Sequence, residues 1–418
     1  MVRPCHPSRP PHDRKLLRTA LLHGLLASVA GVGAAANAQT LALVGGKVYA
    51  SPDAAPLDDA AVVTANGVIT AIGSRSDVQV PSDAQVIDCT GKTVVAGFWN
   101  SHVHFTEAVW RNAASAPAAP LTAHMQEMLT RWGFTTVWSL GSDPDNSMAL
   151  RRRVYADEIL GPNIFLVGSI FPQDGRPAYL PDARIPEAET PARAAEVARY
   201  YLQIGLDGIK LFTGAYKGED KPVVNMEAAI AKAAVDVAHA QGRPVFAHPQ
   251  NTAGIEAVIA AGVDVMAHTV GRQPGYSVEQ LARFKQQGIA LTPTLSLFAK
   301  LPLPPEIVGR IVDNIVGQLK GFSENGNTVL FGTDVGYIPL YDTMLEYELL
   351  HRALSERQVL ASLTTNPAGY FKAAKKGRLE NGFEADVVVL DGDPLADVRN
   401  LAKVAWTIRA GKVIYQKP

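Results

Sequence analysis

The 418-residue sequence predicts an α/β protein, a (β/α)8 TIM barrel with a small β-sandwich domain formed by both ends of the chain. Three observations lead to this prediction. Both ends carry short strands separated by tight-turn sequences. The middle alternates short apolar strands with helices, and histidines follow several of those strands. The order along the chain therefore predicts a β domain split around a parallel α/β core.

The first 38 residues are expected to be a secretion signal. A basic region with Arg14, Lys15 and Arg18 precedes an apolar run over 19–35, and Ala36-Asn37-Ala38 offers small residues for cleavage. The run is short and contains several glycines, which disfavours a lasting membrane anchor. We therefore expect a periplasmic or secreted protein after cleavage.

The composition of the mature chain narrows the function classes. Cleavage removes five of the 39 basic residues and one of the 40 acidic residues, which leaves 34 against 39 and a net charge of −5. No basic run remains, so nucleic acid is not an expected partner. Only Cys89 remains after cleavage, and a single cysteine can form no internal disulfide.

The two ends of the mature chain read as hairpins. Near the N-terminus, apolar strands flank turns expected at Gly45-Gly46 and Asn66-Gly67. Near the C-terminus, a strand over 385–390 and a turn over 391–394 precede a hairpin around Ala410-Gly411. We expect residues 39–95 and 373–418 to pair into the small domain, on either side of a barrel over residues 96–372.

The middle of the chain contains eight predicted barrel strands. Thr190 and Pro191 are expected to begin one helix, which stops at Gly205. Asn225 is expected to cap a second helix, and a third covers Thr252–Ala261. Eight alternating units favour a closed barrel over an open sheet. The predicted strands are Val94–Phe98, Thr135–Leu140, Ile164–Gly168, Gly208–Phe212, Pro244–Ala247, Asp264–Ala267, Ile289–Thr292 and Val329–Gly332.

Histidines mark the ends of these strands, where barrel active sites form. His102 and His104 follow the first strand, and their spacing of two points both rings the same way on an extended segment. His248 and His268 end neighbouring strands. A lone histidine is usually a structural residue, but four of the seven histidines of the mature chain stand at predicted strand ends. The other three lie in helical stretches: His124, His239 and His351.

Two further polar residues lie at strand positions. Lys210 sits in an otherwise apolar strand, where an unpaired ammonium is costly. It is either paired with a carboxylate or carboxylated on its amine, which would make it an anion able to bridge two metal ions. Asp334 follows the last strand, and it either caps the next helix or serves as a ligand and base. Four histidines also lie at predicted strand ends, and this favours the role of ligand and base for Asp334.

The sequence resembles the amidohydrolase superfamily, in its imidazolonepropionase-like and Xaa-Pro-dipeptidase-like branch. The resemblance covers nearly the whole mature chain in the right order. It rests on Val95-Ala-Gly-Phe-Trp-Asn-Ser-His-Val-His104, Gly133-Phe-Thr-Thr-Val-Trp-Ser-Leu-Gly141, Asp207-Gly-Ile-Lys210, Ala247-His248, Ala267-His268, Pro293-Thr-Leu295, Gly332-Thr-Asp334, Thr365-Asn-Pro-Ala368, Gly382-Phe-Glu-Ala-Asp386 and Asp391-Gly-Asp-Pro394.

The resemblance implies a role for each polar residue. His102, His104 and Asp334 would hold one divalent metal ion, and His248 and His268 would hold a second. Carboxylated Lys210 and a hydroxide would bridge the two ions, and Asp334 would act as general acid and base. Zinc is the default ion for imidazole and carboxylate ligands at an open site.

Three functions are compatible with these residues. The first is hydrolysis of an amide bond in a small molecule, such as a dipeptide, an N-acyl amino acid or an amide-containing toxin. The second is hydrolysis of a cyclic amide or an ester, although Lys210 and the signal peptide favour the first. The third is a catalytically silent metal-binding protein. The candidate substrate contacts are Tyr216, Arg272 and Tyr337. The resemblance also implies a homo-oligomer, because members of the family often assemble symmetrically.

Overall fold

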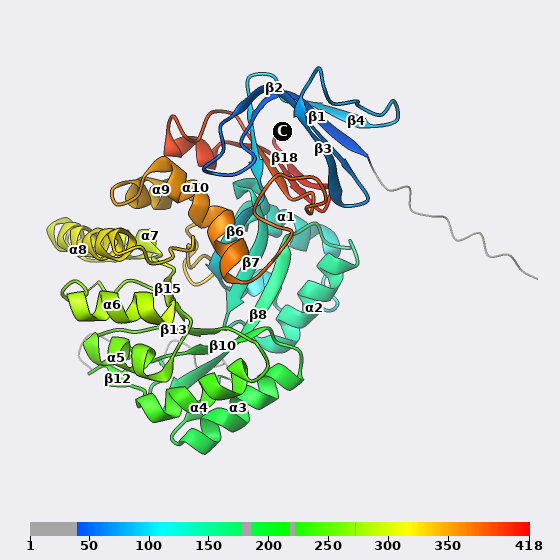
Figure 1. Cartoon of the computed structure of the whole chain (residues 1–418). Coiled ribbons are helices and arrows are strands. Elements are labelled where there is room, and N and C mark those ends of the chain that lie inside the picture. The colour runs from blue at the N-terminus through cyan, green and yellow to red at the C-terminus, as the bar shows by residue number, and fades with distance from the viewer. Residues whose placement is uncertain (1–39, 178–184, 218–221, 272) are drawn as a thin grey trace, which may run out of the picture. The chain divides into compact units, whose positions relative to one another are not determined.

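The computed structural model describes residues 40–177, 185–217, 222–271 and 273–418 (Figure 1). The predicted signal peptide lies outside the described residues. Within those ranges no helix combines the length and the apolar character needed to cross a membrane.

A parallel sheet forms the core of the α/β part. Its strands follow the order β6-β7-β8-β10-β13-β14-β15, with β9 at the side of β8, and every neighbouring pair is parallel. In Figure 1 the helices α2 to α6 lie around the outside of this sheet, with α2 at the right, α3 and α4 at the bottom and α5 and α6 at the left. The strands cover Phe98–Val103 (β6), Phe134–Leu140 (β7), Asn163–Pro172 (β8), Glu187–Ala188 (β9), Gly208–Leu211 (β10), Val245–Ala247 (β13), Val265–Met266 (β14) and Ala290–Leu291 (β15).

Helices connect these strands and cover them. The short pair β11 (Gly214–Ala215) and β12 (Val224–Asn225) lies between β10 and α4. The α-helices are Ala118–Met128 (α1), Pro144–Tyr155 (α2), Pro191–Gln203 (α3), Ala228–His239 (α4), Thr252–Ala261 (α5), Val278–Gln287 (α6), Leu295–Ala299 (α7), Pro305–Glu324 (α8), Met344–His351 (α9), Glu356–Leu363 (α10) and Thr365–Tyr370 (α11). The 3₁₀ helices are Ala108–Trp110 (η1), Thr130–Trp132 (η2) and Val398–Ala402 (η3).

The segment 328–335 contacts both edges of the parallel sheet. The backbone N–H of Leu330 donates to the carbonyl of Leu291 in β15 over 2.9 Å. On the other side, the N–H of Ser101 in β6 donates to the carbonyl of Phe331 over 2.8 Å. This segment therefore lies between the first and last strands of the sheet.

A second sheet combines strands from both ends of the described chain. Its order is β18-β17-β16-β5-β1-β2-β3, with β4 paired to β1. β16 of the C-terminal part pairs antiparallel with β5 of the N-terminal part, and β5 runs parallel to β1. The strands cover Leu41–Val48 (β1), Leu57–Ala65 (β2), Val68–Ser74 (β3), Gln85–Asp88 (β4), Thr93–Ala96 (β5), Val387–Leu390 (β16), Val404–Arg409 (β17) and Lys412–Gln416 (β18).

Turn and cap chemistry explains several confirmed elements. Asn66 and Gly67 both have positive φ, 53° and 78°, as a tight two-residue hairpin turn requires. The side chain of Thr190 accepts a hydrogen bond from the N–H of Arg193 and so begins α3 as expected. α5 covers exactly the predicted residues and ends at Gly262, whose φ is 74°.

The first barrel strand was predicted wrongly over Val94–Phe98. Thr93–Ala96 form β5 in the second sheet, and the parallel sheet begins only at Phe98. Gly97 lies between them, and a Cβ at this position would fall 2.3 Å from Oγ1 of Thr135. Both strands are apolar and no polar residue lies between them. The sequence pattern therefore predicted one strand where the structure has two.

Two local predictions were also wrong. Gly45-Gly46 is not a turn, because β1 continues through it with a shift in register and Gly45 has a φ of 83°. Asn225 does not cap α4, because it pairs in β12 and Glu227 is the residue before the helix. In both cases a residue type that is typical of a turn or of a helix cap lies within a strand instead.

Candidate metal centre

Four predicted side chains gather at the ends of β6 and β14 and at residue 334. His102 is the fifth residue of β6, His104 follows that strand, and His268 lies two residues after β14. Asp334 follows the segment that contacts both sheet edges, and its N–H donates to the carbonyl of His102 over 2.9 Å. Positions far apart in sequence are therefore brought together by neighbouring strand ends.

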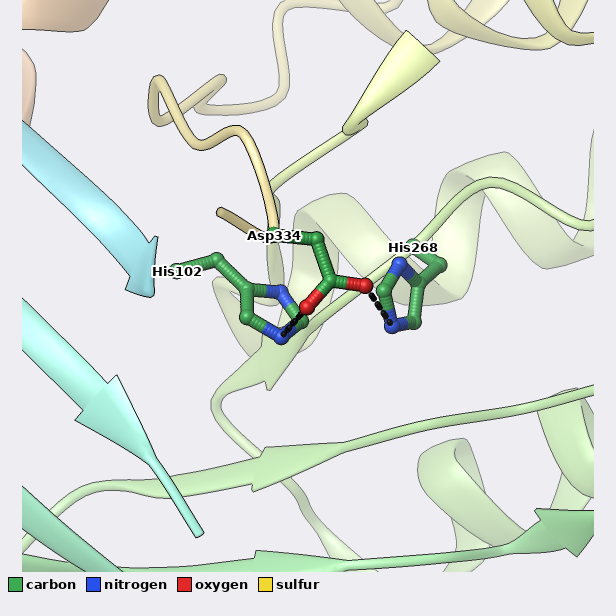
Figure 2. A group of neighbouring side chains, drawn as sticks. All are labelled: His102, His268 and Asp334. Carbon is green, nitrogen blue, oxygen red and sulfur yellow. Dashed lines mark ion pairs between the residues drawn. The ribbon is translucent and has the colours of Figure 1, made fainter. Parts of the chain in front are cut away.

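The Asp334 carboxylate lies between the imidazole rings. Its Oδ1 is 3.1 Å from Nε2 of His102 and 2.9 Å from Nε2 of His104. Its Oδ2 is 3.9 Å from Nε2 of His268, and Figure 2 shows one carboxylate oxygen directed at His102 and the other at His268. The ligand atoms of His102, His268 and Asp334 all lie within 4.8 Å of one another, and these three residues are buried.

The donor set fits a divalent ion. Oδ1 of Asp334 is buried and forms no hydrogen bond with any described residue, although two ring nitrogens lie within 3.1 Å of it. Nε2 of His102 and Nε2 of His104 are 3.3 Å apart. A buried carboxylate oxygen beside several ring nitrogens is the arrangement expected of ligands around a common centre, and imidazole with carboxylate suits zinc.

The Nδ1 atoms of His102 and His268 each have a partner of their own. Nδ1 of His102 lies 3.0 Å from the carbonyl oxygen of Ala267, and Nδ1 of His268 lies 2.8 Å from Oγ1 of Thr294. When each Nδ1–H donates to its oxygen, the lone pair of Nε2 faces Asp334. These contacts fix the ring orientation and the tautomer that a metal ligand needs.

His248 joins the group from the end of β13. Its ring centroid lies 4.4 Å from that of His268, and its own ring is half-buried. Nε2 of His248 lies 2.6 Å from the amide nitrogen of Gln250. The other ring nitrogen, Nδ1, does not make this contact. The structure thus brings His248 next to His268, as the sequence predicted.

Burial dominates the electrostatics of the histidines. Loss of hydration lowers the pKa of His102 to about 4 and lowers the pKa values of His248 and His268 well below their usual range. Burial alone would raise the pKa of Asp334, but His102 and His104 beside it hold that pKa well below its usual value. At neutral pH the rings of His102, His248 and His268 are therefore neutral, and Asp334 is a carboxylate.

Lys210 lies in β10 and is 1% exposed. Burial lowers its pKa to about 7, and the Asp334 charge opposes this shift. Within the described part of the chain it forms no hydrogen bond or ion pair, and its Nζ lies 5.5 Å from the ring centre of Phe212. The predicted carboxylate partner of an unmodified lysine is thus absent within 4 Å among these residues.

The three predicted substrate contacts have different outcomes. Tyr337 is 49% exposed, and its ring meets that of His104 edge-on with centroids 6.5 Å apart. Tyr216 is half-buried and directly follows β11. Arg272 lies outside the described residues. Tyr337 therefore contacts a residue of the predicted site.

Sequence reasoning missed the residues that support the ligands. Thr294 belongs to the Pro293-Thr-Leu295 motif, yet the motif gave no indication that its hydroxyl contacts His268. Gln250 lies two residues after His248, a spacing that could have suggested a shared face. The sequence gives His124 no role beyond that of an ordinary histidine in a helical stretch. In the structure its Nε2 lies 2.6 Å from the carboxylate of Glu107, and Glu107 lies three residues after His104.

Residues 93–414 match the amidohydrolase family. The chain belongs to this family. The ochratoxinase of Aspergillus niger is 24% identical to this amidohydrolase over 406 residues, which cover 83% of this chain and 80% of the relative.

Solved structures agree with this assignment. A Bifidobacterium longum protein assigned as a prolidase has a TM-score of 0.77 and 26% identity, covering 91% of this amidohydrolase and 95% of that protein. A Xaa-Pro dipeptidase with methionine in its active site has a TM-score of 0.75 and 22% identity, covering 91% and 100%. This amidohydrolase is a hydrolase that acts on C–N bonds, as expected from the sequence.

Proposed function

We propose that this amidohydrolase uses two divalent metal ions, zinc by default, to cleave an amide bond in a small molecule. The observation that carries the proposal is the buried Asp334 carboxylate, whose Oδ1 faces Nε2 of both His102 and His104 without a hydrogen bond. Dipeptides, N-acyl amino acids and amide-containing toxins are the proposed substrates. The similarity to a prolidase-assigned protein and to an ochratoxinase supports this class.

Each ion would have its own protein ligands. His102, His104 and Asp334 would hold one ion, and His248 and His268 would hold the other. The tight spacing of the first set and the ring contact of 4.4 Å in the second support this division. For His248, Nδ1 is the proposed ligand atom because Gln250 lies against Nε2.

Lys210 would supply the anion between the two ions. A pKa of about 7 leaves much of the amine neutral near neutral pH, and a neutral amine can attack carbon dioxide. A new N–C bond forms, one proton leaves the nitrogen, and the product is an anionic carbamate. Burial without any ion pair among the described residues supports this proposal, since an anion near two cations would replace a costly isolated ammonium.

The chain's own residues would transfer the protons during the reaction. When bound, the metal ions would lower the pKa of a water molecule and polarise the scissile carbonyl. Asp334 would accept the proton of the attacking water and pass it to the leaving nitrogen. Its pKa, held well below the usual range, keeps it ionised at neutral pH, the form that a general base needs. Tyr337, exposed beside His104, would contact the substrate.

We also propose that residues 96–372 form a closed (β/α)8 barrel, in which the predicted strand Val329–Gly332 takes the eighth position. It is not a regular strand, and among the described residues the segment forms only isolated bridges, at Val329 and Val335. Hydrogen bonds from that segment to both β15 and β6 support closure. The sheet shared by the two chain ends supports a small sandwich domain over 39–95 and 373–418. Export through residues 1–38 and assembly into a homo-oligomer belong to the same proposal.

The test combines metal analysis with a substrate panel. Elemental analysis of the protein purified without chelator should find close to two divalent ions per chain. The metal-replete protein should hydrolyse members of a panel of Xaa-Pro and other dipeptides and N-acyl amino acids, and should be inactive after chelation. Hydrolysis of only lactones or esters would contradict amide specificity, and a metal-replete protein inert on both panels would overturn catalysis.

A further inference from the structure

Thr294, at the start of α7, has an unusual backbone conformation. Its φ is 49° and its ψ is 51°, a left-handed conformation that is rare for a β-branched residue and costs free energy. The residue is completely buried. Such a conformation persists only where the surroundings hold it.

The hydroxyl of Thr294 does not cap its own helix. A threonine before a helix usually has an extended backbone, and its hydroxyl accepts a hydrogen bond from the first turn. Here α7 has no side-chain cap from Thr294, and Oγ1 lies instead 2.8 Å from Nδ1 of His268. The left-handed backbone thus accompanies a hydroxyl that is directed at a proposed metal ligand.

Glu346 of α9 supplies the missing helix cap. Its two carboxylate oxygens accept hydrogen bonds from the N–H groups of Leu295, over 2.9 Å, and Ser296, over 2.6 Å. Glu346 is completely buried and has no cationic partner among the described residues. Burial raises its pKa to about 7, while the Ser296 and Leu295 N–H donors oppose this shift. A buried carboxyl group without a cation is costly, and the hydrogen bonds of this one hold the two residues after Thr294.

We propose that Thr294 and Glu346 are positioning residues that fix the ring of His268 and thereby set the affinity of the metal ion it would hold. The contacts run from the Glu346 carboxylate through the backbone of Leu295 to Thr294 and from its hydroxyl to His268. The inference rests on the proposed function, because it requires His268 to be a ligand. It adds two residues, 26 and 78 positions beyond His268, that no sequence motif connects to it.

The experiment measures metal affinity directly, in the full chain, by competition with a chromophoric zinc chelator. Thr294→Val keeps the shape of the side chain but removes the hydroxyl, and should weaken zinc binding about 10- to 100-fold at the site that His268 would help to form. Thr294→Ser keeps the hydroxyl and should restore binding close to that of the wild type. The absorption spectrum of the cobalt-substituted protein should change in Thr294→Val and not in Thr294→Ser.

Thr292→Val is a matched control. Thr292 is buried two residues earlier, and its hydroxyl forms no hydrogen bond within the described residues. Zinc affinity and the cobalt spectrum should be unchanged in this variant. Equal affinity and equal spectra in Thr294→Val, Thr292→Val and the wild type would overturn the inference.

Glu346→Gln provides a second route if Thr294→Val does not fold. The amide can accept one of the two N–H groups but not both, so the backbone of residues 294–296 should loosen and zinc affinity should fall. Glu348→Gln, on an exposed position of the same helix, is its control. Unchanged affinity in Glu346→Gln would overturn the inference. A wild-type protein that binds no divalent ion would overturn the proposed function instead, so the two failures are distinct.

Discussion

The carboxylate of Glu107 binds the ring of His124 over 2.6 Å and also accepts a hydrogen bond from the hydroxyl of Tyr341. Glu107 lies three residues after His104, and Tyr341 lies seven residues after Asp334. The His124 ring also meets the Tyr341 ring edge-on, with centroids 5.7 Å apart. These contacts connect the loops that follow His104 and Asp334, two proposed ligands of the same ion.

Removing the Tyr341 hydroxyl should weaken this connection. Tyr341→Phe loses a hydrogen bond to a carboxylate, and we expect the free energy of unfolding to fall by about 1–3 kcal/mol. Urea denaturation of the wild type and the variant measures the change. Tyr200→Phe, at a tyrosine that is 57% exposed, should change stability little. Equal losses in both variants would show that Tyr341 contributes no more than a surface tyrosine.

Asp334→Asn tests the proposed acid and base. Asparagine tolerates positive φ, so the backbone at 334, with a φ of 61°, should be kept. The amide cannot accept a proton, and we expect kcat to fall at least about 10²- to 10⁴-fold while the circular dichroism spectrum stays unchanged. Steady-state kinetics on the best amide substrate provides the measurement. The exposed Asp236→Asn should retain full activity, and retention of activity in Asp334→Asn would contradict the assignment.

Lys210→Ala tests the proposed carbamate. The variant loses the anion between the two ions, so its metal content should fall from about two ions per chain. A short carboxylic acid such as propionate should restore part of the metal content and activity by occupying the vacated space. Native mass spectrometry of the wild type should detect the added mass of one carbon dioxide, and this mass should be absent from the variant. An unmodified mass in the active, metal-loaded wild type would contradict the proposal.

Glu346 predicts a specific pH dependence of stability. Its pKa is raised to about 7 in the folded protein, against an ordinary value of 4.5. Between these values the folded chain holds a proton that the unfolded chain releases, so this group costs stability as the pH rises, by at most about 1.4 kcal/mol per pH unit. The stability of Glu346→Gln relative to the wild type should therefore rise from pH 5 to pH 7 and level off above it. A constant difference across this range in urea denaturation would contradict the shifted pKa.

The sequence pattern predicted the parts that depend on local rules. Period-two spacing placed His102 and His104 on one side of an extended segment, and their Nε2 atoms are indeed 3.3 Å apart. Turn chemistry at Asn66-Gly67 and capping at Thr190 predicted element boundaries correctly. In these cases neighbouring residues alone determine the backbone.

Other features depend on contacts that are distant in sequence and could not be predicted. The boundary between β5 and β6 at Gly97 is set by the close approach of Thr135 and by pairing with β16, and not by any local change in polarity. The contact of Glu346 with Leu295 joins residues 51 positions apart, and the hydroxyl of Thr294 is directed by a backbone angle that composition does not encode.

The pairing of β5 with β16 has a consequence for the order in which the chain can fold during synthesis. Ala96 pairs with Val387, roughly 290 residues later, so β5 has a free edge until almost the whole chain has left the ribosome. Closure of such a long loop is slow, and Phe98, the first residue of the parallel sheet, lies only two residues beyond Ala96. Chains interrupted before the last strands would therefore expose an apolar strand edge directly beside the start of the segment that carries His102.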